Sequence, residues 1–146
     1  MSQTDRRPPF RFSTQTRVGF DETDAQGIVY YGRYMPYFDR ARVEYLRHLG
    51  LLHRSSGVPE FVIRAQQVDY LAPARFDDEL EVFVRVRRLG GSSMTWEFAA
   101  EHREAGRLLV TATQTQVRVD AEHRRPVRMP EELRHAITEF EQEVET

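Results

Sequence analysis

The apolar residues of this chain recur with two different periods, which separate strands from helices. Over residues 10–20, Phe, Thr and Val alternate with Arg, Ser and Gln, a period of two that predicts a half-buried strand. Over residues 33–49, apolar side chains recur at spacings of three and four, which predicts one long amphipathic helix. Pro36 fits only the first turn of a helix, so we expect the helix to begin within residues 33–35 and to stop at Gly50.

The rest of the chain predicts four more strands and a terminal helix. We expect the strands at residues 61–71, 77–89, 92–103 and 107–120, and a helix at 131–145. An antiparallel sheet with one apolar face needs a cover, and residues 33–49 form the only large apolar helix. The pattern therefore predicts a single α+β domain over residues 1–146, in which a sheet of about five antiparallel strands curls around that helix.

Composition excludes several kinds of chemistry. The net charge of −2 gives no reason to expect nucleic acid or a membrane surface as the main partner. The chain has no cysteine, which excludes disulfides, thiolate catalysis and cysteine-ligated zinc, and no lysine, which excludes Schiff-base chemistry. Its five histidines show no metal-ligand spacing and no phosphate-binding glycine motif occurs, so we expect no metal and no cofactor.

The N-terminal stretch, residues 1–9, is polar and contains two prolines, and we expect it to be a flexible segment. It lacks the apolar region of a signal peptide, and no run in the chain is long and apolar enough to span a membrane. We therefore expect a cytoplasmic protein.

The candidate chemistry lies at residues 20–34, where a carboxylate-rich loop precedes the start of the long helix. A helix start presents unpaired backbone N–H groups and a partial positive charge, which stabilise a developing oxyanion. A carboxylate beside it serves as a general base or a nucleophile, or simply caps the helix. We interpret Asp21 and Glu22 as solvated loop charges and keep Asp24 as the candidate.

Two motifs of this chain occur at the spacing of a known family. The first reads Asp-Glu-Thr-Asp-Ala-Gln-Gly-Ile-Val-Tyr-Tyr-Gly-Arg-Tyr at residues 21–34, followed by Phe-Asp-Arg-Ala-Arg at 38–42. The second reads Asp-Tyr-Leu-Ala-Pro-Ala-Arg-Phe-Asp-Asp at residues 69–78, with Arg-Pro-Val-Arg-Met-Pro later at 125–130. The chain thereby resembles the 4-hydroxybenzoyl-CoA thioesterase family, most closely its bacterial acyl-CoA thioesterase branch.

The resemblance implies a hotdog fold, with an antiparallel sheet wrapped around a long central helix and a C-terminal helix. It also implies a homodimer that joins two sheets edge to edge, often within a homotetramer, with the sites at the dimer interface. The family's catalytic carboxylate falls on Asp24, and its carbonyl-polarising backbone amide falls on Tyr31. The branch often has His at the position of Tyr31 and an aromatic hydroxyl at that of Phe20, so this chain departs from it twice.

On this interpretation the protein hydrolyses a small or medium acyl-CoA to the free acid and CoA, with CoA as part of the substrate rather than a cofactor. Asp24 acts as base or nucleophile, and the sequence does not choose between the two. Tyr30 and Tyr34 are candidates for the acyl pocket, and arginine suits the phosphates of CoA. The predicted substrate-binding residues are Gly27, Tyr30, Tyr34, Arg87, Arg88 and Arg128.

Two other functions stay open at this point. A hotdog hydratase or dehydratase commonly pairs a carboxylate with His, and the motif region has no His. A non-catalytic module that binds acyl-CoA or an acyl-carrier protein would bind the thioester without releasing a thiol. The identity of the acyl group and the arrangement of a tetramer are not determined by the sequence.

Overall fold

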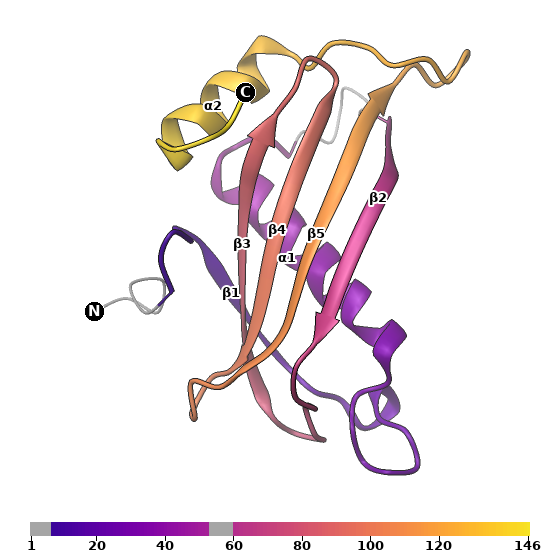
Figure 1. The fold of residues 1–146 in the computed structure, drawn as a ribbon, viewed down its shortest axis with the longest axis vertical. Helices are drawn as coiled ribbons and strands as arrows, with labels where there is room; N and C mark the ends of the chain where they lie inside the picture. The colour runs from indigo at the N-terminus through magenta and orange to yellow at the C-terminus, as the bar shows by residue number, and fades with distance from the viewer. Residues whose placement is uncertain (1–6, 53–59) are drawn as a thin grey trace.

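The structure, a computed structural model, describes residues 7–52 and 60–146 as one sheet with two helices. The strands are β1 (Ser13–Arg17), β2 (Glu60–Tyr70), β3 (Glu79–Leu89), β4 (Ser93–His102) and β5 (Leu108–Val119). The α-helices are α1 (Tyr34–His48) and α2 (Glu131–Glu141), and short 3-10 helices are η2 (Phe20–Glu22) and η3 (Tyr31–Arg33). All strand pairs are antiparallel, in the order β1-β3-β4-β5-β2, and α1 crosses behind the sheet (Figure 1). The predicted α+β hotdog arrangement is confirmed.

The strand predicted at residues 10–20 is much shorter in the structure. β1 covers only Ser13–Arg17, because the chain leaves the sheet on both sides of it. On one side Phe10 packs against Phe83 on the outer face of the sheet, with ring centroids 5.8 Å apart. On the other side Phe20–Glu22 turns as η2, since the Glu22 carboxylate accepts a hydrogen bond from the Gly19 amide at 2.7 Å.

The helix predicted at residues 131–145 ends earlier, at Glu141. Gln142 has a φ of 64°, which lies outside the right-handed helical region, so the helix cannot continue through it. The residues beyond it pair with β3 instead: the Leu89 amide donates to the Glu145 carbonyl at 2.8 Å, and the Glu145 amide donates to Arg87 at 2.9 Å. The C-terminal segment therefore continues the edge of β3 where β1 has ended.

The core lies between α1 and the inner face of the sheet. The buried face of α1 consists of Tyr34, Tyr37, Phe38, Ala41 and Tyr45. Phe38 stacks on Phe98 of β4 at 4.8 Å, and Tyr45 meets Trp96 edge to face at 5.2 Å. Each such aromatic side chain contributes about 2–3 kcal/mol by leaving water, so this contact fixes α1 on the sheet.

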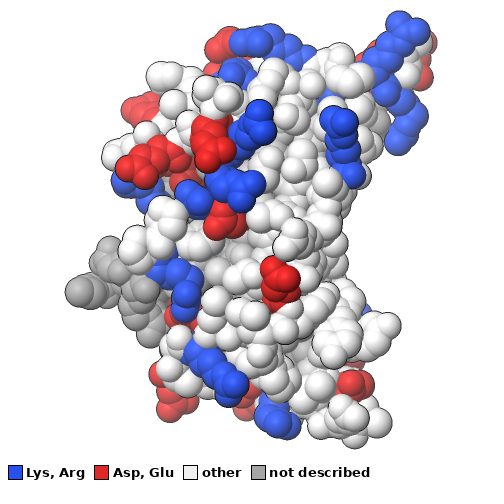
Figure 2. All heavy atoms as spheres, viewed as in Figure 1, with Lys and Arg blue, Asp and Glu red and all other residues white. Residues whose placement is uncertain are grey.

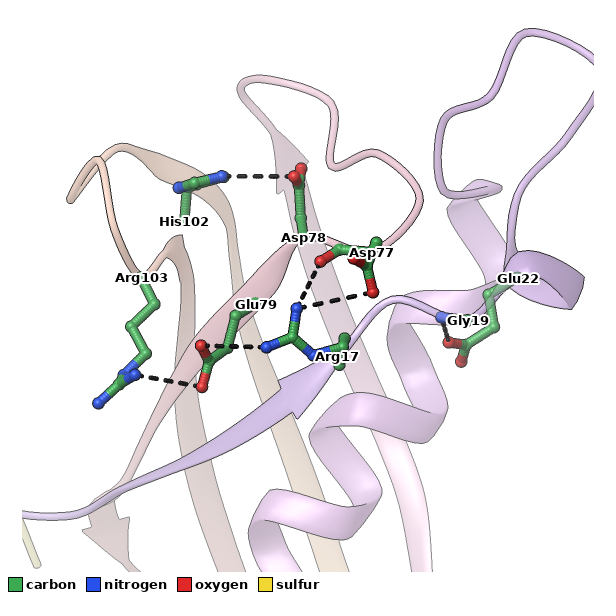
Figure 3. A network of polar contacts seen from close by, with 8 residues as sticks. All are labelled: Arg17, Gly19, Glu22, Asp77, Asp78, Glu79, His102 and Arg103. Carbon is green, nitrogen blue, oxygen red and sulfur yellow. Dashed lines mark hydrogen bonds and ion pairs between the residues drawn. The ribbon is translucent and has the colours of Figure 1, made fainter.

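A network of ion pairs joins the end of β1 to the start of β3 (Figure 3). The Arg17 guanidinium donates to the Asp77 carbonyl at 2.8 Å and lies 3.4 Å from the Glu79 carboxylate. Arg103 contacts the other oxygen of Glu79 at 3.2 Å, and His102 lies 3.4 Å from Asp78. Exposed pairs of this kind add little stability one by one, but together they hold the loop after β1 beside the loop before β3.

The two edges of the sheet differ in length and cover. β1 is short, whereas β2 has eleven residues and pairs, among the described strands, only with β5. Side chains at positions 63–67 of β2 are exposed, including Ile63 at 54%. A long uncovered edge strand is a template for pairing with another chain.

Part of the predicted flexible segment, residues 1–9, lies outside the described residues. Where the description begins, the Arg7 side chain donates two hydrogen bonds to the buried Glu101 carboxylate, at 2.7 and 3.0 Å. Neither described helix is long and apolar enough to cross a membrane.

Candidate active site

A tight hairpin-like loop carries the candidate carboxylate. Thr23 bridges Val29 across its base, and the Asp24 amide donates to the Ile28 carbonyl at 2.9 Å. Gly27 closes the loop with a φ of +77°, a conformation that strains side chains, and its amide donates to Asp24 at 2.9 Å. Gly27 thus has a clear structural role, and its predicted contact with substrate stays a prediction.

The Asp24 carboxylate is exposed, and only one of its two oxygens accepts a hydrogen bond within the described residues. Its Oδ1 accepts a hydrogen bond from the Gln26 amide at 2.8 Å, the turn that Asp and Asn commonly stabilise. Its Oδ2 has no hydrogen-bond partner among the described residues. One oxygen therefore holds a turn of the loop and caps neither η3 nor α1, while the other has no partner among the described residues.

The backbone amide of Tyr31 opens the helical segment. Tyr30 before it is extended, with φ −65° and ψ 138°, and η3 then leads directly into α1. As the first amide of η3, Tyr31 N–H has no hydrogen-bond acceptor within the described part of the chain. Its carbonyl, by contrast, accepts from the Tyr34 amide and lies 3.4 Å from the Tyr70 hydroxyl.

Beside this amide lies a hollow of about 220 Å³, here called the tyrosine hollow. Its walls are the rings of Tyr31, Tyr34 and Tyr70, together with residues 28–29 and 71–73. The Tyr31 and Tyr70 rings are 4.7 Å apart, and Tyr70 lies 5.8 Å from Tyr34. Burial raises the pKa of Tyr34, so its hydroxyl stays protonated at neutral pH.

The predicted aromatic residues divide between two places. Of the two tyrosines predicted for the acyl pocket, Tyr34 lines the tyrosine hollow, together with the ring of Tyr31. The Tyr30 ring instead covers Gly32, where an added Cβ would lie 3.3 Å from it. Phe20, in place of an aromatic hydroxyl, is 77% exposed and meets Phe76 edge to face at 5.7 Å.

The interpretation of Glu22 as a solvated charge is wrong. Its side chain is only 16% exposed, because one oxygen caps the Gly19 amide and the other lies 4.0 Å from Arg40. Together with burial, the Glu22 carboxylate raises the pKa of the Tyr37 hydroxyl. Glu22 therefore anchors the start of the active-site loop to α1.

The three arginines predicted to meet CoA lie at the other end of the sheet. Arg87 and Arg88 stand near the end of β3, about 30 Å along the strand from its start beside the Asp24 loop. Arg87 lies 3.8 Å from Glu97, and Arg128 lies 3.2 Å from Glu131. Figure 2 shows the same mixing, with red side chains among the blue ones over much of the visible face. A single chain does not bring these arginines to Asp24.

The sequence reasoning missed Tyr70 and Leu71 as wall residues. Both belong to the second family-like motif, and Tyr70 ends the alternating pattern of β2, which was the available signal. This end of the molecule also holds most of the exposed large apolar side chains: Phe20, Tyr30, Tyr31, Tyr70, Leu71 and Phe76. Apolar side chains gathered at the surface mark an interaction site. Within the described residues, no three His, Asp or Glu side chains are grouped to hold a metal ion.

Comparison with known proteins identifies the family. Residues 18–137 match the family model described as the Thioesterase-like superfamily. The acyl-CoA thioesterase YbgC of Haemophilus influenzae is 34% identical over 128 residues, 86% of this chain and 93% of the relative. The structure of a probable thioesterase from Bartonella henselae is 34% identical, with a TM-score of 0.72 over 82% of this chain and 98% of that one.

A third relative has been solved with a ligand. This thioesterase, from Thermus thermophilus and in complex with coenzyme A and zinc, is 27% identical, with a TM-score of 0.79 over 93% of this chain and 98% of that one. The family model covers β2 to β5, the central helix and the candidate site. The chain therefore belongs to the thioesterase-like superfamily of hotdog proteins.

Proposed function

We propose that this protein hydrolyses the thioester of small or medium acyl-CoA molecules to the free acid and CoA. The observation that carries the proposal is the unpaired Tyr31 amide at the helix start, beside the tyrosine hollow and on the same loop as Asp24. The name of the YbgC relative and the coenzyme A in the Thermus structure support the same chemistry.

The Tyr31 amide would bind the thioester oxygen. As the carbonyl carbon becomes tetrahedral, its oxygen gains negative charge, and the amide and the positive helix end lie where that charge develops. A backbone donor is independent of the side chain, so Tyr31 serves here as well as His would. An imidazole role, in contrast, has no counterpart at this position.

The free oxygen of Asp24 would act on the carbonyl carbon in one of two ways. As a general base it takes a proton from water, which adds to the carbon; the C–S bond then breaks, and the proton leaves with the CoA thiolate. As a nucleophile it forms a mixed anhydride and releases the CoA thiolate, and water then cleaves the anhydride. The geometry suits either route, because Oδ2 is unpaired.

A second copy of the chain would complete the site. Asp24 and Tyr31 are exposed in the single chain, and the uncovered edge of β2 suits antiparallel pairing with a second β2. In such pairing the strands of the partner's sheet run in the opposite direction. This arrangement puts the sheet end that carries Arg87, Arg88 and Arg128 at the same end of the joined sheet as the Asp24 loop.

The test is release of CoA thiol from acyl-CoA by the wild type and by Asp24→Asn. The Asn side chain keeps the oxygen that accepts from Gln26, so the loop stays folded. We expect kcat to fall by about 100-fold or more, as when a group that acts in the transition state is lost. The matched control is Asp21→Asn, an exposed carboxylate in the same loop, which should keep wild-type kcat. Near wild-type hydrolysis by Asp24→Asn would remove Asp24 from the mechanism.

One observation favours a second function, that of a non-catalytic acyl-CoA-binding module. Asp24 already holds its own loop through Oδ1. This chain also has Phe20 where the branch often has an aromatic hydroxyl, and Tyr31 where the branch often has His, so both of those side chains are missing here. The same assay separates the two functions, because a binding module retains acyl-CoA without releasing thiol. An acyl-carrier protein as the source of the thioester, and a cytoplasmic location, stay predictions.

A further inference from the structure

Two glutamines and one arginine form a polar cluster where the apolar interior meets the open edge of the sheet. Gln114 of β5 and Gln66 of β2 face each other on the inner side of the sheet, in register with Trp96. Arg42 of α1 reaches them from the helix, with its guanidinium over the rings of Trp96 and Phe98 at 5.5 and 5.6 Å. Gln114 is 1% exposed and Arg42 is 12% exposed, so burying this polar cluster carries a cost that a function would explain.

The hydrogen bonds of the cluster run in one direction. Arg42 Nη2 donates to Gln114 Oε1, and Gln114 Nε2 donates to Gln66 Oε1 at 2.6 Å. Both glutamine oxygens are thereby used as acceptors. The groups left over are donors: Arg42 Nε is buried without a partner, and Gln66 Nε2 has none among the described residues. These unpaired donors therefore favour a ligand that brings an acceptor oxygen.

The cluster lies farther along the two elements that line the tyrosine hollow, α1 and β2, and outside the lining of the hollow itself. On the inner face of β2, Tyr70 of the hollow is followed by Val68 and then by Gln66, about 13 Å away. Along α1, Arg42 lies about 16 Å beyond Tyr31, and its side chain leans back toward the helix start. Between them, the Met35 sulfur lies 3.8 Å from Gln114 Nε2.

We propose that Arg42, Gln114 and Gln66 recognise an oxygen acceptor at the distal end of the acyl chain. The inference rests on the proposed thioesterase function, since it places the thioester at Tyr31. The Arg42 side chain reaches back by roughly 6 Å, which leaves about 10 Å for the acyl chain. At ~1.5 Å per carbon–carbon bond, the preferred substrate is then an acyl-CoA of roughly six to eight carbons that ends in a carboxylate or a carbonyl. A carboxylate would compete with Asp39, whose exposed carboxylate accepts from Arg42 Nη1 at 2.9 Å.

The experiment compares three acyl-CoA molecules of equal length: hexanoyl-CoA, adipoyl-CoA with a terminal carboxylate, and 5-oxohexanoyl-CoA with a neutral carbonyl. For the wild type we expect kcat/KM to favour at least one oxygen-bearing chain over hexanoyl-CoA by about tenfold, as for one charge-assisted hydrogen bond. If only adipoyl-CoA is preferred, the cluster recognises a carboxylate. If both oxygen-bearing chains are preferred, it recognises any acceptor oxygen.

Two variants and one control test the residues. Gln66→Leu changes an exposed position and Arg42→Met keeps the length of the buried stem, and each should reduce the preference about tenfold. The control is Gln67→Leu, the next residue of β2, whose side chain faces away and lies near Asp69; it should keep the wild-type ratio.

Equal kcat/KM for all three chains, or a preference that survives both Gln66→Leu and Arg42→Met, would overturn the inference and leave the thioesterase proposal standing. Release of no thiol from any of the three would count against the thioesterase proposal itself, and the inference would fall with it.

Discussion

The two ends of α1 are built in opposite ways. At the C-terminal end a buried hydroxyl and a buried amide share one acceptor: the Tyr45 hydroxyl donates to Glu141 Oε2 at 2.6 Å, and the same oxygen accepts from the Val86 amide at 2.9 Å. At the N-terminal end the Tyr31 amide is unpaired among the described residues, and the Tyr31 side chain is 60% exposed. One helix is thus anchored at one end and left open for chemistry at the other.

The closed end shows how a buried carboxylate serves structure. β1 stops short of Val86, so the Val86 amide on that side of β3 would have no partner. Glu141 of α2 supplies the missing acceptor and ties α2 to both α1 and the sheet. Glu141 is buried and its contacts stabilise the fold, whereas Asp24 is exposed at the surface and accessible from solvent.

The strongest test of the open end removes the Tyr31 N–H alone. Proline fits the first residue of a helix, and Tyr30 already has the extended conformation required before proline. We expect Tyr31→Pro to lower kcat by about 100-fold, the loss typical of one oxyanion donor. The control is Tyr31→Ala, which removes the same ring but keeps the amide. The kcat of both variants is measured in single-turnover and steady-state assays. If both variants lose activity equally, the side chain matters and the amide does not.

The next test breaks the closed end. Glu141→Ala leaves a buried hydroxyl and a buried amide unpaired, and we expect it to lower the free energy of unfolding by about 2 kcal/mol. Urea denaturation measures the loss, and Tyr45→Phe in the Glu141→Ala background should cost less than it does in the wild type. At temperatures well below unfolding, kcat of Glu141→Ala should stay at the wild-type value. A large drop in kcat would mean that the two ends are not independent.

The smallest effect concerns pH. Burial raises the pKa of Glu141 above its ordinary value, against the opposing hydrogen bonds and the charges of Arg85 and Arg11. The folded state therefore binds this proton more tightly than the unfolded state, so the contribution of Glu141 to stability is full below pH 4.5 and declines as pH rises through the raised pKa. The thermal midpoint of the wild type, relative to Glu141→Gln, should thus fall as the pH rises above 4.5. A difference that is constant or rises with pH would contradict this assignment.

Local patterns were sufficient to predict most of the fold. Alternation located β3, β4 and β5 to within two residues, and Pro36 and Gly50 bounded α1 as expected, because these signals act between near neighbours in sequence. The failures came from contacts across the chain. The strand at residues 10–20 was shortened by Phe10 packing on Phe83, and the last helix was ended by the pairing of Glu145 with β3.

The site could be predicted only in part for the same reason. The loop with Asp24 and the helix start with Tyr31 are adjacent in sequence, so their neighbourhood was foreseeable. The role of Glu22 depends on Arg40, which lies in α1 on a separate element. The wall formed by Tyr70 depends on a strand some forty residues later, as the contact of Tyr70 with Tyr31 shows. The cluster of Gln66, Gln114 and Arg42 joins three separate elements, and no local pattern indicates such a meeting.

Tyr70 is the last residue of an edge strand and also one wall of the tyrosine hollow. Any chain that pairs with this strand therefore pulls on the pocket wall directly. If a second copy pairs there, as proposed above, assembly and substrate binding share one equilibrium. Dilution would then loosen the pocket, and a well-fitting substrate would favour the assembled form.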